Sequence, residues 1–282
     1  MIDFIVVGAQ KAGTSWMYAC LYEHPQICAP TKEIHYFSRQ RNFKKGLEWY
    51  ENIFARCEEG KLKGEFSTTY LYDEKTPQRI KDISLDTKII MSLRNPVTRA
   101  FSQYRNLIKG GDVDKAASFD EVSEKDASVL GQGMYFEQAK RYIDTFGKEN
   151  VLVLVYEDSK KDPAGFIRQI FEFLEVDPDF KPTMLHRKVN TARTPKTIWI
   201  EKVMMHVAEI LRRCGLGKIF WLIKKSSLPD KVRSMNTEQR DIVLDKETEI
   251  KLKQYFKEDV QKLATLTDKK MVSQWHIGET AK

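Results

Sequence analysis

The 282-residue sequence predicts an α/β fold, in which a central, mainly parallel β-sheet is flanked by helices and followed by a helical C-terminal part. Apolar runs occupy residues 4–7, 86–93 and 151–156, as expected of strands buried on both faces. Helical patterns separate these runs, which favours right-handed βαβ units. Ligands of such sheets bind at the carboxyl ends of the strands, so the residues after each run are the first candidates for a site.

The first apolar run enters a glycine-bounded loop, Gly8-Ala-Gln-Lys11-Ala-Gly13-Thr14-Ser15. A helix is expected over residues 16–22, with Thr14 and Ser15 in its first turn. Its unpaired N–H groups and positive dipole end suit a phosphate or sulfate. The spacing resembles the nucleotide-triphosphate loop G-x-x-x-x-G-K-[ST], except that Lys11 precedes the second glycine. The alternative is a plain strand-to-helix turn with a solvated Lys11.

A second anion site is expected where the strand over residues 86–93 ends at Arg94-Asn-Pro96 and a helix over 97–108 begins. A nucleotide kinase would often place an aspartate there to organise magnesium. An arginine fork at this edge suits a second phosphate, held directly and without metal. Ser102 lies within the helix, where its hydroxyl can face the same phosphate.

Two polar segments are candidates for the acceptor side. Lys32-Glu-Ile-His35-Tyr-Phe37 is expected to place Lys32 beside the anion site, with a Glu-His pair toward the acceptor; a surface turn is the alternative. Glu65 follows a glycine at the head of a β-prone run and is flanked by Ser and Thr hydroxyls. A carboxylate at a strand end is a candidate general base, although an exposed strand-edge glutamate is the commoner case.

Further helices are expected over residues 76–83, 136–146, 164–175 and 238–266, and a capping box over 118–121. The Pro-rich basic stretch 181–196 is interpreted as a loop that closes over the site, or as a tether. Basic apolar residues 211–225 suit a membrane surface, a partner or a partly buried hairpin. We expect a single domain over 1–282, divided into a cofactor-binding core (1–177) and a closing loop with the helical part (178–282).

Composition narrows the class of protein. The formal net charge of +7 suits a polyanionic ligand. The basic residues are scattered and show no nucleic-acid reading motif. No apolar stretch is long enough to span a membrane, and no signal peptide precedes the first strand. The four cysteines, at 20, 28, 57 and 214, lack C-x-x-C spacing, which argues against a zinc site or disulfide framework and favours a reduced, cytoplasmic compartment.

Together these segments resemble the sulfotransferases that use 3′-phosphoadenosine 5′-phosphosulfate (PAPS), in particular the branch of heparan sulfate N- and 3-O-sulfotransferases. The resemblance runs from Ile2 to about Leu174, with a weaker echo to Trp275, and implies a P-loop-like α/β fold. The segments that carry it are Gly8–Ser15, Lys32–Phe37, Gly46–Tyr50, Gly64–Tyr70 and Arg94–Tyr104.

The resemblance implies roles for individual residues. Lys11 contacts the sulfate and the bridging oxygen, and Glu65 is the catalytic base. The donor site comprises Gln10, Lys11, Ala12, Gly13, Thr14, Ser15, Trp16, Arg94, Ser102, Tyr135, Arg193 and Lys196; Lys32 and His35 lie on the acceptor side, and no metal takes part. Two departures stand out: Phe66 replaces a frequent lysine, and residues 190–196 replace a Lys-Gly pair, so either Arg193 or Lys196 completes the site.

The implied activity is in-line transfer of a sulfuryl group from PAPS to a hydroxyl or amine, with a carbohydrate as the acceptor that the relatives suggest. The alternatives are a P-loop kinase of a nucleotide or small metabolite and a non-catalytic nucleotide-binding protein. The misplaced Lys11 and the absence of a strand-end aspartate argue against the kinase.

Overall fold

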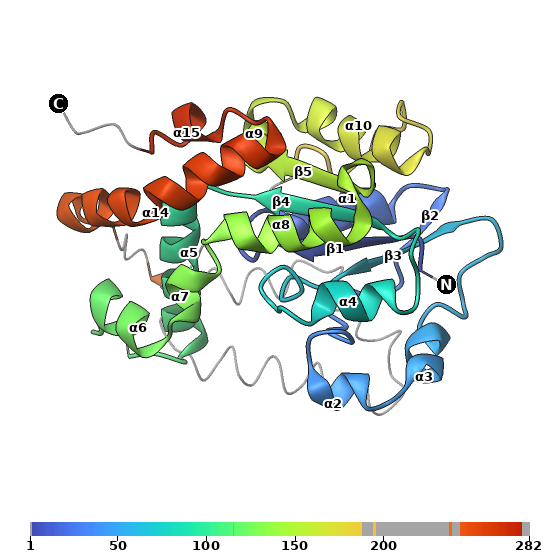
Figure 1. Cartoon of the computed structure of the whole chain (residues 1–282), viewed down its shortest axis with the longest axis horizontal. Coiled ribbons are helices and arrows are strands. Elements are labelled where there is room, and N and C mark those ends of the chain that lie inside the picture. Colours follow the sequence, from blue (N-terminus) through green and yellow to red (C-terminus); the bar gives the residue numbers. More distant parts are fainter. Residues whose placement is uncertain (1, 115, 188–193, 196–236, 239–242, 278–282) are drawn as a thin grey trace.

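The computed structural model describes residues 2–114, 116–187, 194–195, 237–238 and 243–277 (Figure 1). Its central sheet has five parallel strands in the order β2-β3-β1-β4-β5. The strands are β1 (Phe4–Gly8), β2 (Ile27–Cys28), β3 (Leu62–Phe66), β4 (Lys88–Leu93) and β5 (Val151–Val155). The predicted α/β class with a mainly parallel sheet is confirmed, and the carboxyl ends of β1, β3 and β4 meet at one edge.

Apolar side chains cover both faces of this sheet, as the continuous runs predict. On one face α1 (Thr14–Tyr22) and α10 (Pro163–Leu174) pack against β1. On the other face lie α8 (Tyr135–Phe146) and α14 (Lys246–Thr267) (Figure 1). The remaining helices are α2 (Gln40–Phe43), α3 (Leu47–Asn52), α4 (Thr76–Lys81), α5 (Pro96–Gly110), α6 (Phe119–Lys125), α7 (Ser128–Gly131), η1 (Lys148–Asn150), α9 (Asp158–Lys161) and α15 (Met271–Gln274). A separate antiparallel pair joins β6 (Thr194–Pro195) to β7 (Thr237–Glu238).

Helix caps in the sequence account for several boundaries. The Asn95 side chain accepts hydrogen bonds from the first turn of α5, and Ser118 with Glu121 forms the predicted capping box of α6. The charge pattern predicted that the long C-terminal helix begins at Glu238, and this boundary is wrong. Glu238 belongs to β7, and α14 begins at Lys246 because the Asp245 side chain caps it through the Thr248 N–H.

The strand that carries Glu65 also differs from expectation. β3 ends at Phe66, so Glu65 lies near the end of the strand and the residues after it turn away. Gly64 allows this strand to approach β1, since a Cβ at that position would lie 2.1 Å from the Phe4 ring. The sequence therefore predicted the correct edge of the sheet, but it placed Glu65 at the beginning of the β-strand, whereas Glu65 lies near the end of β3.

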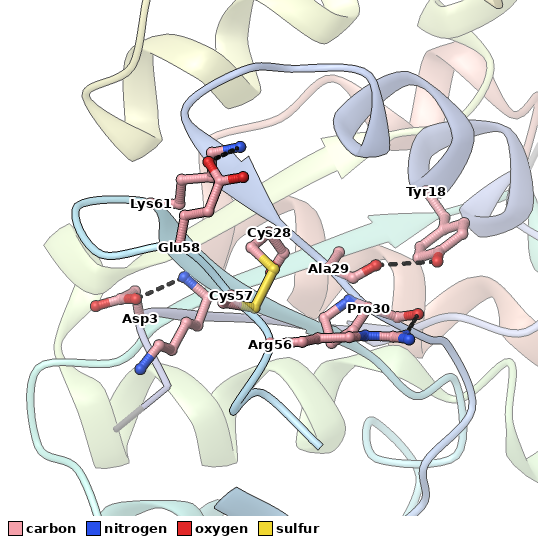
Figure 2. The surroundings of a disulfide bond; sticks show 10 residues. Asp3, Tyr18, Cys28, Ala29, Pro30, Arg56, Cys57, Glu58 and Lys61 are labelled. Carbon is pink, nitrogen blue, oxygen red and sulfur yellow. Dashed lines mark hydrogen bonds and ion pairs between the residues drawn. A yellow bond between two sulfur atoms is a disulfide. The ribbon is translucent and has the colours of Figure 1, made fainter. Parts of the chain in front are cut away.

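Cys28 and Cys57 form a disulfide bond, and the prediction against one was wrong (Figure 2). β2 and the end of the α3 region lie beside each other, and Arg56 strengthens the junction by donating to the Pro30 carbonyl at 2.7 Å. Cysteine spacing along the chain did not reveal this pairing, because β2 and β3 bring the two residues together only in the fold. Disulfides persist in oxidising surroundings, so the argument for a reduced compartment loses its basis. Within the described ranges, no helix has the length and apolarity to cross a membrane.

Candidate active site

The loop after β1 is fixed in place by contacts with β4 and with the residue that follows β5. Ser92 on β4 donates its hydroxyl to the Ala12 carbonyl at 2.9 Å, and its own carbonyl accepts from the Ala9 N–H at 2.8 Å. Gly13 precedes α1 with φ of 79°, and a Cβ there would lie 2.6 Å from the Tyr156 ring at the end of β5. Glycine is therefore required for both the left-handed backbone and the close approach of the ring. The N-terminus of α1 is left facing the space above the sheet.

Arg94 connects this loop to the next strand-helix junction. Its Nη1 donates to the Lys11 carbonyl at 3.0 Å, and its Nε donates to the Thr98 hydroxyl at 2.9 Å. The guanidinium also lies over the Tyr156 ring, 5.4 Å from its centre. From behind, the buried Tyr135 hydroxyl donates to the Arg94 carbonyl at 3.0 Å. Both the side chain and the backbone of this arginine are therefore fixed.

A cavity of 1240 Å³ opens at the junction of these elements. Of the residues predicted for the donor site, those that line it are Lys11, Gly13, Thr14, Ser15, Trp16, Arg94 and Ser102. The half-exposed Gln10, the buried Ala12 and the buried Tyr135 do not line it. Ala12 is part of the loop and its carbonyl accepts from Ser92, and Tyr135 contacts the Arg94 carbonyl from behind. Arg193 and Lys196 lie outside the described residues, as does the segment 211–225.

The wall of this cavity is strongly basic. Beyond the predicted residues, it includes Arg105, Lys109, Lys160, Arg187 and Lys253, and among the described lining residues Glu249 is the sole carboxylate. Burial, followed by the charges of Lys109, Arg94 and Arg99, lowers the pKa of Lys11 to about 8. A cluster of like charges is unfavourable until an anion enters, so this wall is suited to a ligand with several negative charges.

Sequence reasoning missed these additional cations. Arg105 and Lys109 follow Ser102 by three and seven residues on α5, so helical periodicity places them on its face. Tyr156 was interpreted as a possible core residue, whereas it lines the cavity beneath Arg94 and Lys160. Lys160 and Lys253 come from other helices, and no local pattern linked them to the site.

The Lys32–Phe37 segment lies against the same loop. The Lys32 ammonium donates to the Ser15 hydroxyl at 2.7 Å and lies 3.7 Å from a Glu33 carboxylate oxygen. The other Glu33 oxygen lies 3.2 Å from His35 Nε2, and the Thr68 backbone N–H donates to that oxygen at 3.2 Å. Burial lowers the pKa of His35, although the Glu33 charge opposes this shift. The expected Glu-His pair is therefore formed, one residue from a lysine that reaches the loop.

Glu65 lies below this segment and does not line the cavity. Its side chain has no exposed surface, and its carboxylate accepts hydrogen bonds from the hydroxyls of Tyr50, Ser67 and Tyr70. Burial raises its pKa to about 7, while the three hydrogen bonds act in the opposite direction. The alternative interpretation of Glu65 as an exposed glutamate at a strand edge is therefore wrong. The two glutamates therefore differ in environment: Glu33 is partly exposed, whereas Glu65 is enclosed.

Comparison with known proteins identifies the class to which this fold and site belong. Residues 1–271 match the family model described as the sulfotransferase domain, so the chain belongs to that family. A crystal structure of a sulfotransferase from Alicyclobacillus acidocaldarius superimposes with a TM-score of 0.71 and 26% identity, covering 98% of this chain and 99% of that one. The sulfotransferase domain of the curacin biosynthetic pathway shares the fold, with a TM-score of 0.52, 14% identity and coverage of 68% and 80%.

Curated relatives narrow the likeness further. Over 180 residues the chain is 32% identical to mouse heparan sulfate glucosamine 3-O-sulfotransferase 3A1, covering 60% of this chain and 44% of that protein. Human heparan sulfate glucosamine 3-O-sulfotransferase 3B1 is 31% identical, covering 60% of this chain and 45% of that protein. The chain thus spans less than half the length of these relatives. The resemblance to the heparan sulfate sulfotransferase branch and the fold class predicted from the sequence are confirmed.

Proposed function

We propose that this protein transfers a sulfuryl group from PAPS to a hydroxyl or amine of a carbohydrate by in-line displacement. The observation that carries the proposal is that the α1 loop, Arg94 and Ser102 share one basic cavity. PAPS carries a 5′-phosphosulfate and a 3′-phosphate, which match two separated anion sites. The volume of 1240 Å³ exceeds the roughly 300–1,000 Å³ of ordinary ligand pockets, which leaves room for an acceptor beside the nucleotide.

The residues of the cavity fit this donor. Lys11 and the α1 N-terminus with Thr14 and Ser15 would hold the phosphosulfate, and Arg94 with Ser102 would hold the 3′-phosphate. The donor supplies the sulfuryl group and a stable leaving group, adenosine 3′,5′-bisphosphate. Lys11, with its pKa of about 8, remains mostly charged at neutral pH and can stabilise negative charge that grows on the leaving oxygen.

The proton acceptor is the second part of the proposal. Glu65 as the base stays a prediction from the resemblance; its carboxylate is buried, and this burial raises its pKa to about 7. Glu33 lies in the Lys32–Phe37 segment, and neither it nor Glu65 lines the cavity. The Glu33 carboxylate is about one-third exposed, contacts His35 and is linked through Lys32 to the sulfate-binding loop. We propose Glu65 as the base, because a pKa of about 7 suits proton transfer at neutral pH, with Lys32, Glu33 and His35 on the acceptor side.

The acceptor proposal rests on charge and on the relatives. The two curated relatives described above are named for heparan sulfate, an acidic glycan. Arg39, Arg41, Lys44 and Lys45 are all exposed on and beside α2, in the segment that follows Phe37. A basic surface that follows the Lys32–Phe37 segment is suited to such a chain.

The test is transfer from ³⁵S-labelled PAPS to N-sulfated heparosan oligosaccharides, read by mass spectrometry, with adenosine 3′,5′-bisphosphate binding measured by calorimetry. We expect transfer that Lys11→Ala and Glu65→Gln each reduce by about 100-fold or more. Lys140→Ala, on the outer surface of α8, is the control. Magnesium-dependent phosphate transfer from ATP would support the kinase alternative instead. Tight binding of the bisphosphate without transfer to any acceptor would support the non-catalytic one.

A further inference from the structure

Lys32 belongs to the acceptor-side segment, yet its side chain points to the loop that would hold the donor. Its Nζ donates to the Ser15 hydroxyl oxygen across 2.7 Å. Ser15 lines the cavity, whereas Lys32 does not. The ammonium therefore reaches the cavity wall through Ser15, and the mechanism proposed above gives this contact no role.

The chemistry of the two groups fixes the direction of this hydrogen bond. A lysine ammonium has three protons to donate and no lone pair with which to accept, so the Ser15 oxygen must be the acceptor. A serine hydroxyl has one proton, which must then point away from Lys32. Within the described part of the chain, no other group accepts that proton. It is consequently available to an acceptor in the cavity, and an anion at the N-terminus of α1 is such an acceptor.

Contacts within the protein fix the position of Lys32. The Glu33 backbone N–H donates to the Phe66 carbonyl at 2.6 Å, which attaches the segment to the end of β3. Earlier in the chain, the Tyr18 hydroxyl of α1 donates to the Ala29 carbonyl at 3.0 Å. A Glu33 carboxylate oxygen lies 3.7 Å from the Lys32 Nζ and stabilises the ammonium. The lysine is therefore held between β3 and α1, with its charge directed at the loop.

We propose that Lys32 is a positioning residue of the donor site: its ammonium orients the Ser15 hydroxyl so that the hydroxyl donates its proton to the 5′-phosphate of the donor. A hydroxyl that accepts from a cation is also a stronger donor, because the two hydrogen bonds polarise each other. This inference rests on the proposed function and gives Lys32 a role beyond the acceptor side, where the resemblance placed it. The same lysine joins the acceptor-side segment to the loop that binds the phosphosulfate.

A double-mutant cycle tests whether Lys32 acts through Ser15. Binding of adenosine 3′,5′-bisphosphate to the full chain is measured by calorimetry, and we expect Lys32→Met and Ser15→Ala each to weaken it by about tenfold. If Lys32 acts through the hydroxyl, the double variant should bind within about threefold of Ser15→Ala. A lysine that contacted the donor independently would give multiplied losses of about 100-fold, and this result would overturn the inference. Lys32→Arg keeps a cationic donor and should retain most of the affinity.

A ligand without the 5′-phosphate locates the effect. Adenosine 3′-phosphate keeps the nucleoside and the phosphate assigned to Arg94, but it offers nothing for the Ser15 hydroxyl to bind. We expect its affinity to change by less than about twofold in Lys32→Met, whereas Arg94→Lys should weaken its binding. Equal losses for the two ligands in Lys32→Met would show that the lysine does not act at the 5′-phosphate and would overturn the inference.

Lys61→Met is the matched control, because Lys61 also forms an ion pair with a nearby glutamate and its side chain is 32% exposed, against 29% for Lys32. It precedes β3, at the edge of the sheet opposite the cavity, and this variant should bind both ligands as wild type does. An unchanged affinity for the bisphosphate in Lys32→Met would overturn the inference, and Lys32→Ala takes its place if the methionine variant does not fold.

The choice of nucleotide separates this inference from the proposed function. Wild-type protein that binds ATP with magnesium but not the bisphosphate would overturn the proposed function alone, and the same double-mutant cycle with ATP would then decide the inference. Binding of neither nucleotide would overturn both.

Discussion

The Arg94 guanidinium donates a hydrogen bond to the Lys11 carbonyl across 3.0 Å, so the residue that follows β4 is joined directly to the loop that follows β1. The two proposed anion sites are consequently not independent. Loss of the Arg94 guanidinium removes a hydrogen bond that holds the Lys11 backbone, whereas a change of the Lys11 side chain leaves the accepting carbonyl in place.

Replacement of Arg94 by lysine should weaken binding of adenosine 3′,5′-bisphosphate by about 10- to 100-fold, measured by calorimetry. Lysine keeps the charge but cannot donate to Lys11, Thr98 and a phosphate together. Arg168→Lys, an exposed change on α10, should leave the affinity unchanged. Equal affinities for Arg94→Lys and wild type would place the 3′-phosphate elsewhere.

Donor binding should weaken as the pH rises through 8. Burial and neighbouring cations lower the pKa of Lys11 to about 8, so the ammonium is charged below this pH and loses its proton above it. The affinity for the bisphosphate, measured by calorimetry from pH 7 to 9, should fall across this window. Lys11→Arg stays charged throughout and should bind with a flatter pH profile. Parallel profiles for the two proteins would contradict this role of Lys11.

Reduction of the Cys28–Cys57 bond should lower the free energy of unfolding by about 3 kcal/mol, because the bond constrains the unfolded chain between two residues 29 apart. Urea unfolding with and without dithiothreitol measures the effect. Cys57→Ser should be destabilised to a similar extent, and dithiothreitol should have no further effect on this variant. A wild-type midpoint that is insensitive to reductant would show that the cysteines are not paired in solution.

Asp259 should make the stability of the protein depend on pH between about 4 and 6. Its carboxylate accepts from the Tyr135 N–H at 2.7 Å and the Phe136 N–H at 3.1 Å, yet burial raises its pKa to about 6. Because the pKa in the fold lies above that of the unfolded chain, its contribution is complete below pH 4 and decreases as the pH rises through 6. Relative to Asp259→Asn, wild type should lose about 2 kcal/mol of unfolding free energy from pH 4 to 7. Chemical denaturation at both pH values tests this, and a constant difference would refute it.

Short-range patterns predicted much of the fold. The apolar runs of β1, β4 and β5, the caps at Asn95 and Ser118, and the glycine-bounded loop all have causes within a few residues along the chain. The expected positions of Arg94 and Ser102 at the cavity also followed, because the ends of neighbouring parallel strands meet at one edge.

The remaining features depend on contacts between distant segments. No local pattern revealed that Tyr50 would enclose Glu65, because the two residues meet only after the strands have assembled. The same holds for Cys28 and Cys57 and for the Tyr156 ring above Gly13.

The sequence by itself determined the main apolar strands and the glycine-bounded loop after the first of them, since backbone preferences and the burial of apolar runs act locally. Only the tertiary structure decided which of two glutamates is accessible. Accessibility to solvent is set by everything that packs around a side chain, and those neighbours come from α3, β3 and the turn after it.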